Sequence, residues 1–260
     1  MSKQTLTKER PPKRLVIKLK QRAGRGSSGR ITVRHRGGGV KRLYRLVDFK
    51  QRRLDDPFRV IRFEYDPYRT ANIALVEYQN GDQSYIIAPH GLKEEDELVV
   101  SEKSELKIGN RMKIKNVPVG TIVHNIEFIP NKGGQFVRSA GSGAKIMAHE
   151  GKYTTIEMPS KEIRKIHGDC FASIGMISNP EHRYKKIKKA GVSRRLGRRP
   201  SVRGSAMNPV DHPHGGGEGR APIGMPAPKT PWGKIAIGGK TRRRKNTNHL
   251  IIKRRRKKRR

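Results

Sequence analysis

The chain has little cysteine, few aromatic side chains and few acidic ones. Its single cysteine, Cys170, excludes an internal disulfide and any zinc site built from several cysteines. One unpaired cysteine is typical of a reducing compartment. No run of about 18 apolar residues occurs, so we expect no membrane-spanning helix, and the first residues lack the apolar core of a secretory signal. We therefore expect a cytoplasmic protein, or one of an organellar matrix or stroma, with no membrane partner.

Motifs for catalysis and for small ligands are also missing. Neither glycine-rich nucleotide pattern, G-x-x-x-x-G-K-[ST] or G-x-G-x-x-G, is complete. His167 lies three residues before Cys170, but side chains at that spacing in a strand point to opposite faces, and a buried structural cysteine is the commoner state. We predict no enzyme, no cofactor, no metal site and no small-molecule substrate. Aromatic residues make up only 5% of the chain, which argues against a sheet that stacks successive single-stranded bases.

Positive charge is what the chain has in abundance. Lys and Arg number 60 against 22 Asp and Glu, for a net charge of +38. Residues 1–42 hold 14 basic residues and one acid, and residues 193–260 hold 21 and two, whereas the middle is nearly balanced. Two such arms repel themselves and need a polyanion to order them, which favours nucleic acid as the partner. A membrane surface is the rival, but an interfacial helix needs an apolar face that neither arm offers.

Between the arms the apolar pattern predicts an all-β fold. Alternating residues at 60–65 and 73–78, then Asn80-Gly81 and 85–88, predict strands and a hairpin, and the spacing is typical of a small barrel. A second β set follows at 121–129, 135–140, 145–149, 153–158, 162–166 and 171–177. We predict a basic arm over 1–41, barrels over 42–116 and 117–192, and a basic extension over 193–260. Residues 31–33 predict a short strand with a basic face, and the chain from Val192 onward an extended tail.

The stretch from Met207 to Arg220 is unusual among these segments. Pro209 and Pro213 exclude a helix or a central strand, and the glycines that follow allow another backbone to come close. Asp211, His212 and His214 add polar groups that can donate or accept hydrogen bonds. Insertion into a crowded polar site is one interpretation, and a surface loop of turn-forming residues is the other. Zinc ligation by these three side chains is a weak third.

Several motifs in order resemble those of a known family. They are Gly29–Arg36 with Gly37, Gly38 and Gly39, Tyr65-Asp66-Pro67, Ala71-Asn72-Ile73-Ala74, Pro118-Val119-Gly120-Thr121, His124-Asn125, Lys132-Gly133-Gly134-Gln135, Arg138-Ser139-Ala140-Gly141, Arg203-Gly204, Met207–Arg220 and Thr230-Pro231-Trp232-Gly233. Together they resemble the L2 (uL2) family of large-subunit ribosomal proteins, of bacterial or organellar type. The resemblance implies an OB-fold-like barrel, then an SH3-like barrel, with both extensions threaded into 23S-type rRNA of the ribosome.

The resemblance also implies partners and site residues. The partners are 23S-type rRNA, other large-subunit proteins and the small subunit across the interface, and the implied roles are subunit association, tRNA placement and peptide-bond formation. His212 matches the histidine discussed for that last role, and we interpret it as supporting or positioning rRNA, with direct proton transfer as the alternative. The implied rRNA-contacting residues are Arg30, Arg34, His35, Arg36, Lys41, Arg42, Arg194, Arg195, Arg198, Arg199, Arg203, Asp211, His212, His214, Gly215, Gly216, Gly217, Arg220, Trp232, Arg242, Arg243 and Arg244.

Trp232 is the one tryptophan, and it lies in the basic tail, where no protein core is evident. Its indole either stacks on a base or sugar or packs against the parent domain, and the sequence does not choose between the two. Two other classes of function also stay open. A protein that compacts DNA or RNA without sequence preference would need only the charge, and a metal-dependent nuclease would use Asp211, His212 and His214.

Overall fold

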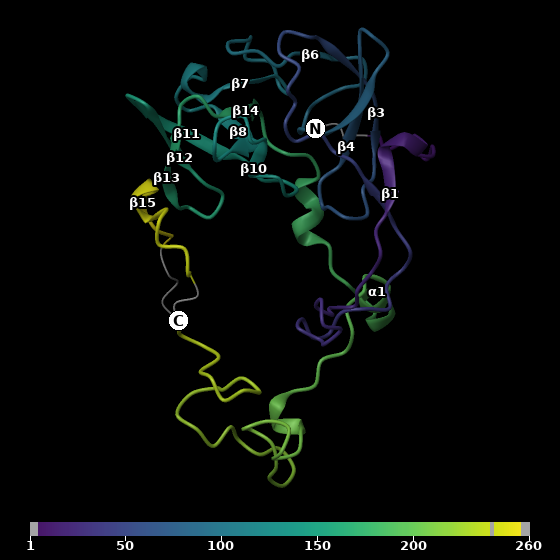
Figure 1. Ribbon diagram of the computed structural model, residues 1–260, viewed down its shortest axis with the longest axis vertical. Coiled ribbons are helices and arrows are strands. Elements are labelled where there is room, and N and C mark those ends of the chain that lie inside the picture. The colour runs from purple at the N-terminus through teal and green to yellow at the C-terminus, as the bar shows by residue number, and fades with distance from the viewer. Residues whose placement is uncertain (1–4, 240–241, 256–260) are drawn as a thin grey trace. The chain divides into compact units, whose positions relative to one another are not determined.

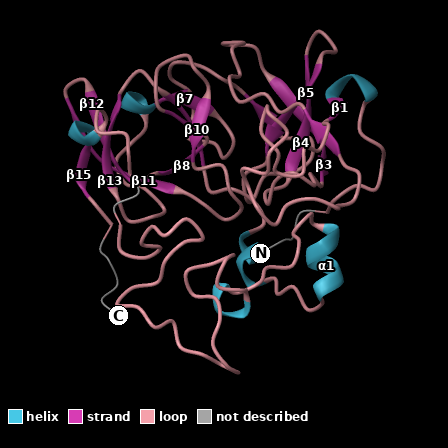
Figure 2. Ribbon diagram, turned by 60° about the horizontal axis from the view of Figure 1, so that its bottom comes forward, coloured by secondary structure: helices cyan, strands magenta, loops and turns pink. Residues whose placement is uncertain are grey.

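The computed structural model describes residues 5–239 and 242–255. The fold is nearly all-β, as predicted, and Figure 2 shows its strands joined by long loops with few helical turns. Among the described residues one α-helix occurs, α1 (Ala190–Arg195), and no helix has the length and hydrophobicity to cross a bilayer. Short 3-10 turns cover η1 (Lys13–Leu15), η2 (Ile114–Asn116), η3 (Pro180–Tyr184), η4 (Gly204–Ala206) and η5 (Asn248–Leu250).

The first barrel contains a four-stranded antiparallel sheet in the order β5-β4-β3-β6. Its strands are β3 (Phe58–Glu64), β4 (Ile73–Tyr78), β5 (Gln83–Ile87) and β6 (Glu97–Leu98), of which Figure 1 labels β3, β4 and β6 and Figure 2 labels β5. The predicted Asn80-Gly81 hairpin is confirmed, because β4 pairs with β5 and Gly81 takes a φ of 78°. A bulge between Val60 and Arg62 bends β3, and the concave face buries Phe58, Phe63 and their apolar neighbours. A two-stranded ribbon of β1 (Val16–Lys18) and β2 (Leu43–Arg45) was not predicted.

The second barrel is a seven-stranded antiparallel sheet in the order β15-β13-β12-β11-β8-β14-β7. Each of the six predicted runs overlaps a strand. The strands are β7 (Arg111–Lys113), β8 (Ile122–His124), β9 (Ile126–Glu127), β10 (Gly134–Phe136), β11 (Ala144–Glu150), β12 (Tyr153–Glu157), β13 (Ile163–His167), β14 (Phe171–Ile174) and β15 (Ile251–Lys253), with β9 and β10 paired to each other. Strand β15 comes from the basic extension and pairs with β13 at the sheet edge.

A buried ion pair holds the second barrel together. Arg111 on β7 and Glu127 on β9 are each almost wholly buried, and the Arg111 Nη2 lies 3.2 Å from the Glu127 Oε1. The guanidinium also donates to the carbonyl of Asn125 at 2.8 Å. The Glu127 carboxylate accepts backbone N–H groups of Asn131, Gly133 and Phe171 at 3.0 to 3.1 Å. Burial lowers the pKa of Arg111, and Glu127 opposes that shift. One carboxylate therefore ties a loop, β14 and β7 together.

His124 on β8 gives the barrel a dependence on pH. Its ring is buried and its Nδ1–H donates to the carbonyl of Gly175 at 2.9 Å. Burial, helped by the nearby charge of Arg111, lowers the pKa of His124 from 6.5 to about 4. The unfolded chain therefore takes up a proton at this ring before the folded chain does. The contribution to stability is complete above pH 6.5 and is lost as the pH falls towards 4.

Acid titration of the folded chain tests this. Between pH 6.5 and 4, His124 is expected to lower the free energy of unfolding by roughly 3 kcal/mol. Urea melts across that range should show the loss in the wild type. A His124→Asn variant keeps a side-chain N–H donor but cannot titrate, so its curve should be flatter by that amount. Identical curves for the two proteins would contradict the assignment.

The described chain forms two compact units. One holds residues 42–186 with the flanking segments up to Leu19 and from Thr247 onward, and the other holds residues 20–41 and 187–246. The strand predicted at 31–33 is wrong, because there Ile31 forms only an isolated bridge to Arg25. Gly24 and Gly29, both with positive φ, bring the chain back on itself too tightly for a longer ladder. The extended tail expected from Val192 begins instead inside α1.

Candidate nucleic-acid interface

Two segments 160 residues apart in the sequence pair inside the second unit. The Gly37 N–H donates to Gly197 and the Val40 N–H to Arg195, both at 3.0 Å, and the Arg199 N–H donates to His35 at 3.1 Å. An antiparallel bridge joins Arg36 to Arg198, and the His35 Nδ1 lies 3.0 Å from the carbonyl of Pro200. Together with the adjoining Arg34, these residues define the arm junction, 34–40 with 195–200. It brings the two predicted groups of arginines together.

Glycine makes this close pairing possible. A Cβ on Gly39 would lie 3.1 Å from the Cα and N of Gly197 and 3.2 Å from the carbonyl oxygen of Arg195. Such distances are shorter than ordinary van der Waals contacts, so a side chain there would push the segments apart. The backbone that comes close to Gly39 is that of the other arm.

The junction concentrates positive charge without neutralising it. Its exposed basic side chains are those of Arg34, Arg36, Arg195, Arg198 and Arg199. Within the part of the chain that the structure describes, none of these forms an ion pair with a carboxylate. Among the described residues, the buried Nη1 of Arg194 has no hydrogen-bond partner.

The loop from Met207 to Gly217 folds on itself around His212. The His212 ring is only 8% exposed, and its Nδ1 accepts the N–H of His214 at 3.0 Å. The Gly215 N–H donates to the carbonyl of His212 at 2.8 Å, and the Gly216 N–H to that of Met207 at 3.1 Å. The two imidazoles meet edge to face with centroids 4.9 Å apart. The His212 ring therefore closes the loop from inside.

The groups that this loop presents outward are different ones. Val210 is 95% exposed, and Asp211 is also exposed. His214 uses its Nε2 to accept the N–H of Lys229 at 2.9 Å, which links the loop to a later segment. Gly204 lies against the His212 ring, where a Cβ would overlap the imidazole. Of the predicted loop residues, Asp211 is therefore displayed, while His212 and His214 shape the loop.

Replacing Gly215 by alanine tests the loop closure. A Cβ there would overlap the carbonyl oxygen of Asn208, so the closed turn must open. Overpacking of this kind costs about 1–3 kcal/mol, which lowers amide protection locally by roughly ten- to hundredfold. Hydrogen exchange at the amides of His214 and Gly216 measures it. Gly191→Ala is the matched control, because a Cβ there meets nothing within 4 Å, and unchanged exchange in the Gly215 variant would contradict the closure.

Trp232 stands at the tip of a tight turn. The Gly233 N–H donates to the carbonyl of Thr230 at 2.9 Å, the pattern of a β-turn with Pro231 in its second position. The Thr230 N–H donates to Lys234 at 2.7 Å, and a bridge joins Lys229 to Ile235. The indole is 75% exposed. The indole is therefore accessible to another molecule.

The remaining predicted residues lie in different settings. Arg42 is engaged inside the first barrel, where its Nη1 donates to Pro67 at 2.9 Å and its guanidinium lies 4.4 Å from the ring centroid of Tyr68. The others, Arg30, Lys41, Arg203, Arg220, Arg242, Arg243 and Arg244, have exposed side chains. Gly216 and Gly217 take φ values of 87° and 85°, which suit glycine.

A second basic hollow was not predicted. It has a volume of about 610 Å³ and is lined by Val47, Asp48, Phe49, Lys50, Lys132, Gly134, Gln135 and Arg138. The Arg138 guanidinium lies 4.3 Å from the ring centroid of Phe49. Burial, followed by the charge of Arg69, lowers the pKa of Arg138. The basic, glycine-rich motif Lys132-Gly133-Gly134 could have predicted this hollow. It was used for the family resemblance, but its residues were not included among the predicted RNA-contacting residues.

Cys170 lies in the core of the second barrel. Burial raises the pKa of its thiol to about 12, with smaller contributions from Glu127 and Asp169. The sulfur is therefore protonated near neutral pH, and a thiol in that state is a poor nucleophile. Its surroundings are those of a packing residue.

Two curled β-barrels joined to two strongly basic arms define a class, the nucleic-acid-binding proteins. Two family models match the chain: "Ribosomal Proteins L2, RNA binding N-terminal domain" over residues 12–101, and "Ribosomal Proteins L2, C-terminal domain" over residues 107–233. The chain belongs to the ribosomal protein L2 family, whose members are RNA-binding structural components of the large ribosomal subunit. The two barrels are the OB-fold-like and SH3-like domains of that family, as the resemblance had implied.

Proposed function

We propose that this chain holds 23S-type rRNA in the large subunit through the arm junction, and that the loop around His212 positions rRNA there. The main support for this proposal is a cluster of arginines in one junction that have no carboxylate partner among the described residues. They are Arg34, Arg36, Arg198 and Arg199. Each guanidinium can form two hydrogen bonds with a phosphate. When the two arms pair, their positive charges repel each other, and the phosphates of a polyanion reduce that repulsion. RNA binding and ordering of the arms therefore stabilise each other.

The loop from Met207 to Gly217 has a positioning role in this proposal. The buried His212 keeps the loop closed, and the loop displays Val210 and Asp211 to rRNA near the peptidyl-transferase region. Through that placement the chain supports tRNA placement and association with the small subunit, beside other large-subunit proteins. The proposal gives His212 this positioning role rather than a role in proton transfer. The proposed location is the ribosome of the cytoplasm, or of an organelle if the gene is organellar.

Sedimentation of lysate through a sucrose gradient tests the proposal. The wild-type chain is expected with the large subunit, and a His212→Ala chain is expected there too, in subunits that synthesise peptides more slowly. His182→Ala, at an exposed histidine, is the matched control and should behave as wild type. A wild-type chain at the top of the gradient would overturn the proposal in favour of a compacting protein.

Loss of the His212→Ala chain alone from the subunit would make the loop an anchor and overturn its positioning role. Peptide synthesis at the wild-type rate in His212→Ala subunits would overturn that role as well. The assignment of residues 1–41, 42–116, 117–192 and 193–260 to arm, barrel, barrel and extension stays a prediction.

A further inference from the structure

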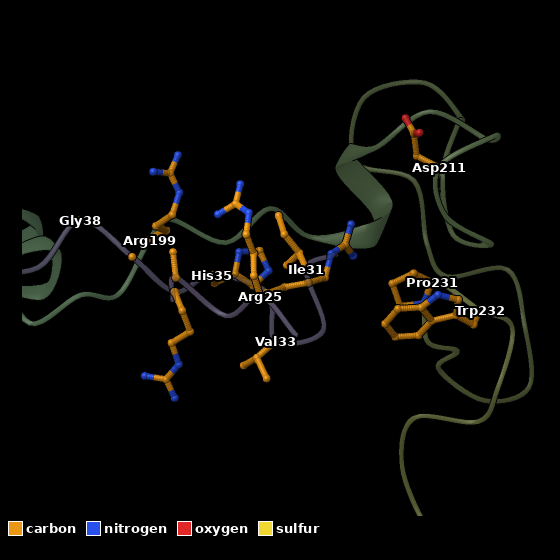
Figure 3. A pocket seen from close by; sticks show the side chains of 13 residues that line it. Arg25, Ile31, Val33, His35, Gly38, Arg199, Asp211, Pro231 and Trp232 are labelled. Atoms are coloured by element: carbon orange, nitrogen blue, oxygen red, sulfur yellow. The ribbon is translucent and has the colours of Figure 1, made fainter. Parts of the chain in front are cut away.

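Trp232 borders a hollow within the second unit. The hollow has a volume of about 870 Å³, and its apolar lining includes Ile31, Val33, Pro231 and Trp232. A volume of this order is typical of sites that enclose a small organic group. Figure 3 shows the Trp232 indole beside Pro231, with Ile31, Val33 and His35 coming from the other arm. Both basic arms of the chain therefore contribute residues to one cavity.

Within residues 5–239 and 242–255, no side chain covers the apolar groups of this hollow. Ile31 is 58% exposed, Val33 is 53% exposed and Trp232 is 75% exposed. Leaving such side chains in water forgoes the free energy of their burial. A flat, apolar ligand held between the indole and the two aliphatic side chains would recover it. A nucleobase has that shape, and stacking between bases and aromatic side chains does not depend on base identity.

The polar lining fits the rest of a nucleotide. Arg25, Arg34, Arg36 and Arg199 line the hollow with exposed guanidinium groups that suit phosphate. Asp211 is the one acidic residue in the lining, and it forms no ion pair among the described residues. A carboxylate only accepts hydrogen bonds. It therefore suits a base N–H or a ribose 2′-hydroxyl, not the phosphate.

The backbone of Trp232 is already fixed before any ligand binds. The Thr230–Gly233 turn fixes the backbone of Trp232, and the Lys229 N–H donates to the Nε2 of His214 at 2.9 Å. His214 is thus a positioning residue for the turn that displays the indole. Preorganisation of this kind reduces the entropy lost when a ligand binds.

We propose that this hollow is a pocket for one unpaired nucleotide of RNA, with its base on Trp232, its phosphates on the arginines and its base or ribose hydrogen-bonded to Asp211. The proposal rests on the proposed RNA-binding function and adds to it a defined subsite. It differs from phosphate contact along the arms because it requires a base. An RNA backbone without bases would still bind the arms but would leave the indole uncovered.

Trp232 is the only tryptophan, so its fluorescence reports on the pocket directly. The full-length chain would be titrated with a short single-stranded oligoadenylate, with an abasic oligonucleotide of the same length, and with heparin. Excitation at the red edge of the tryptophan band avoids tyrosine. The oligoadenylate is expected to quench the emission at least severalfold more than either baseless polyanion. Binding of all three is followed separately by filter retention.

Variants complete the test. Trp232→Ala is expected to weaken oligoadenylate binding by about fivefold to a hundredfold, the range for one lost stack, and Trp232→Phe much less. Both changes are at an exposed side chain, so the fold should persist. His214→Ala should reduce the quenching while the arms still retain RNA. Arg59→Ala, far in sequence and on an exposed ion pair, is the control that should change neither readout.

The outcomes separate the two proposals. Equal quenching by oligoadenylate and by the baseless polyanions would overturn the pocket, because the indole would then report charge alone. Retention of oligoadenylate without quenching, or with no loss in Trp232→Ala, would also overturn the pocket while leaving RNA binding intact. Failure to retain any of the three polyanions would overturn the proposed function itself.

Discussion

Replacing Arg111 by alanine is expected to lower the free energy of unfolding by about 3–5 kcal/mol, because it leaves the Glu127 carboxylate buried without its cation. The same carboxylate holds the N–H groups of Gly133 and Phe171, so the loss extends from β7 to the neighbouring loop and β14. Equilibrium unfolding in urea, followed by circular dichroism, measures it. A carboxylate that stays ionised in a dry core is costly, and one that picks up a proton loses its strongest hydrogen bonds.

Two further variants decide whether the effect belongs to the buried pair. Arg59→Ala removes a cation from the exposed pair with Glu95 and is expected to cost no more than about 1 kcal/mol. The double variant Arg111→Met with Glu127→Leu removes both charges, and much of the loss should be recovered because no unpaired charge remains. An Arg111→Ala loss as small as that of Arg59→Ala would show that Glu127 is supported by its backbone partners alone.

Removing four junction arginines together is expected to weaken RNA binding more than any other surface change. The variant combines Arg34→Ala, Arg36→Ala, Arg198→Ala and Arg199→Ala, all at exposed side chains. Each phosphate that is no longer neutralised lowers the steepness of log K against log salt by roughly 0.7 to 0.9, so the slope should shrink by about 3. At physiological salt the affinity should fall by roughly two to three orders of magnitude. Filter binding to rRNA across a salt series measures both.

The matched control removes the same charge from the other unit. Arg53, Arg59, Lys161 and Lys165 each lie beside a carboxylate, those of Asp82, Glu95, Glu157 and Glu150. Because these cations are already neutralised locally, their replacement by alanine should reduce the slope much less. The junction pairs through backbone atoms, so the fourfold variant should keep its arm pairing. Equal slopes for the two fourfold variants would mean that net charge alone, and not the junction, governs binding.

Local sequence signals predicted the barrels well, because their strands follow short-range rules. Asn80-Gly81 lies between two alternating runs, and the hairpin forms there with Gly81 at positive φ. Strands β1 and β15 escaped prediction, since each is three residues long and is stabilised by pairing with a distant strand. Ile251 pairs with Arg164, a partner that no periodic pattern in the basic extension indicates.

The sequence predicted which residues belong to the candidate site but not how the fold brings them together. The high positive charge of the arms indicated the arginines, but no local sequence pattern could predict the hydrogen bond from Gly37 to Gly197. The Met207–Gly217 loop was recognised from its prolines and glycines, but which of its histidines faces inward depends on Gly204, outside the motif. For Trp232 the sequence left two alternatives open, stacking on RNA or packing against a protein domain, because the exposure of a side chain depends on the whole fold.

Ultraviolet crosslinking of intact large subunits, with mass spectrometry of the crosslinked peptides, tests the central claim most directly. If the arm junction, the loop and the Trp232 turn form the RNA interface, crosslinks should concentrate in residues 23–38, 194–211 and 229–235. Trp232 should be crosslinked to a base. Crosslinks confined to the strands of the two barrels, with none in those three segments, would contradict the account.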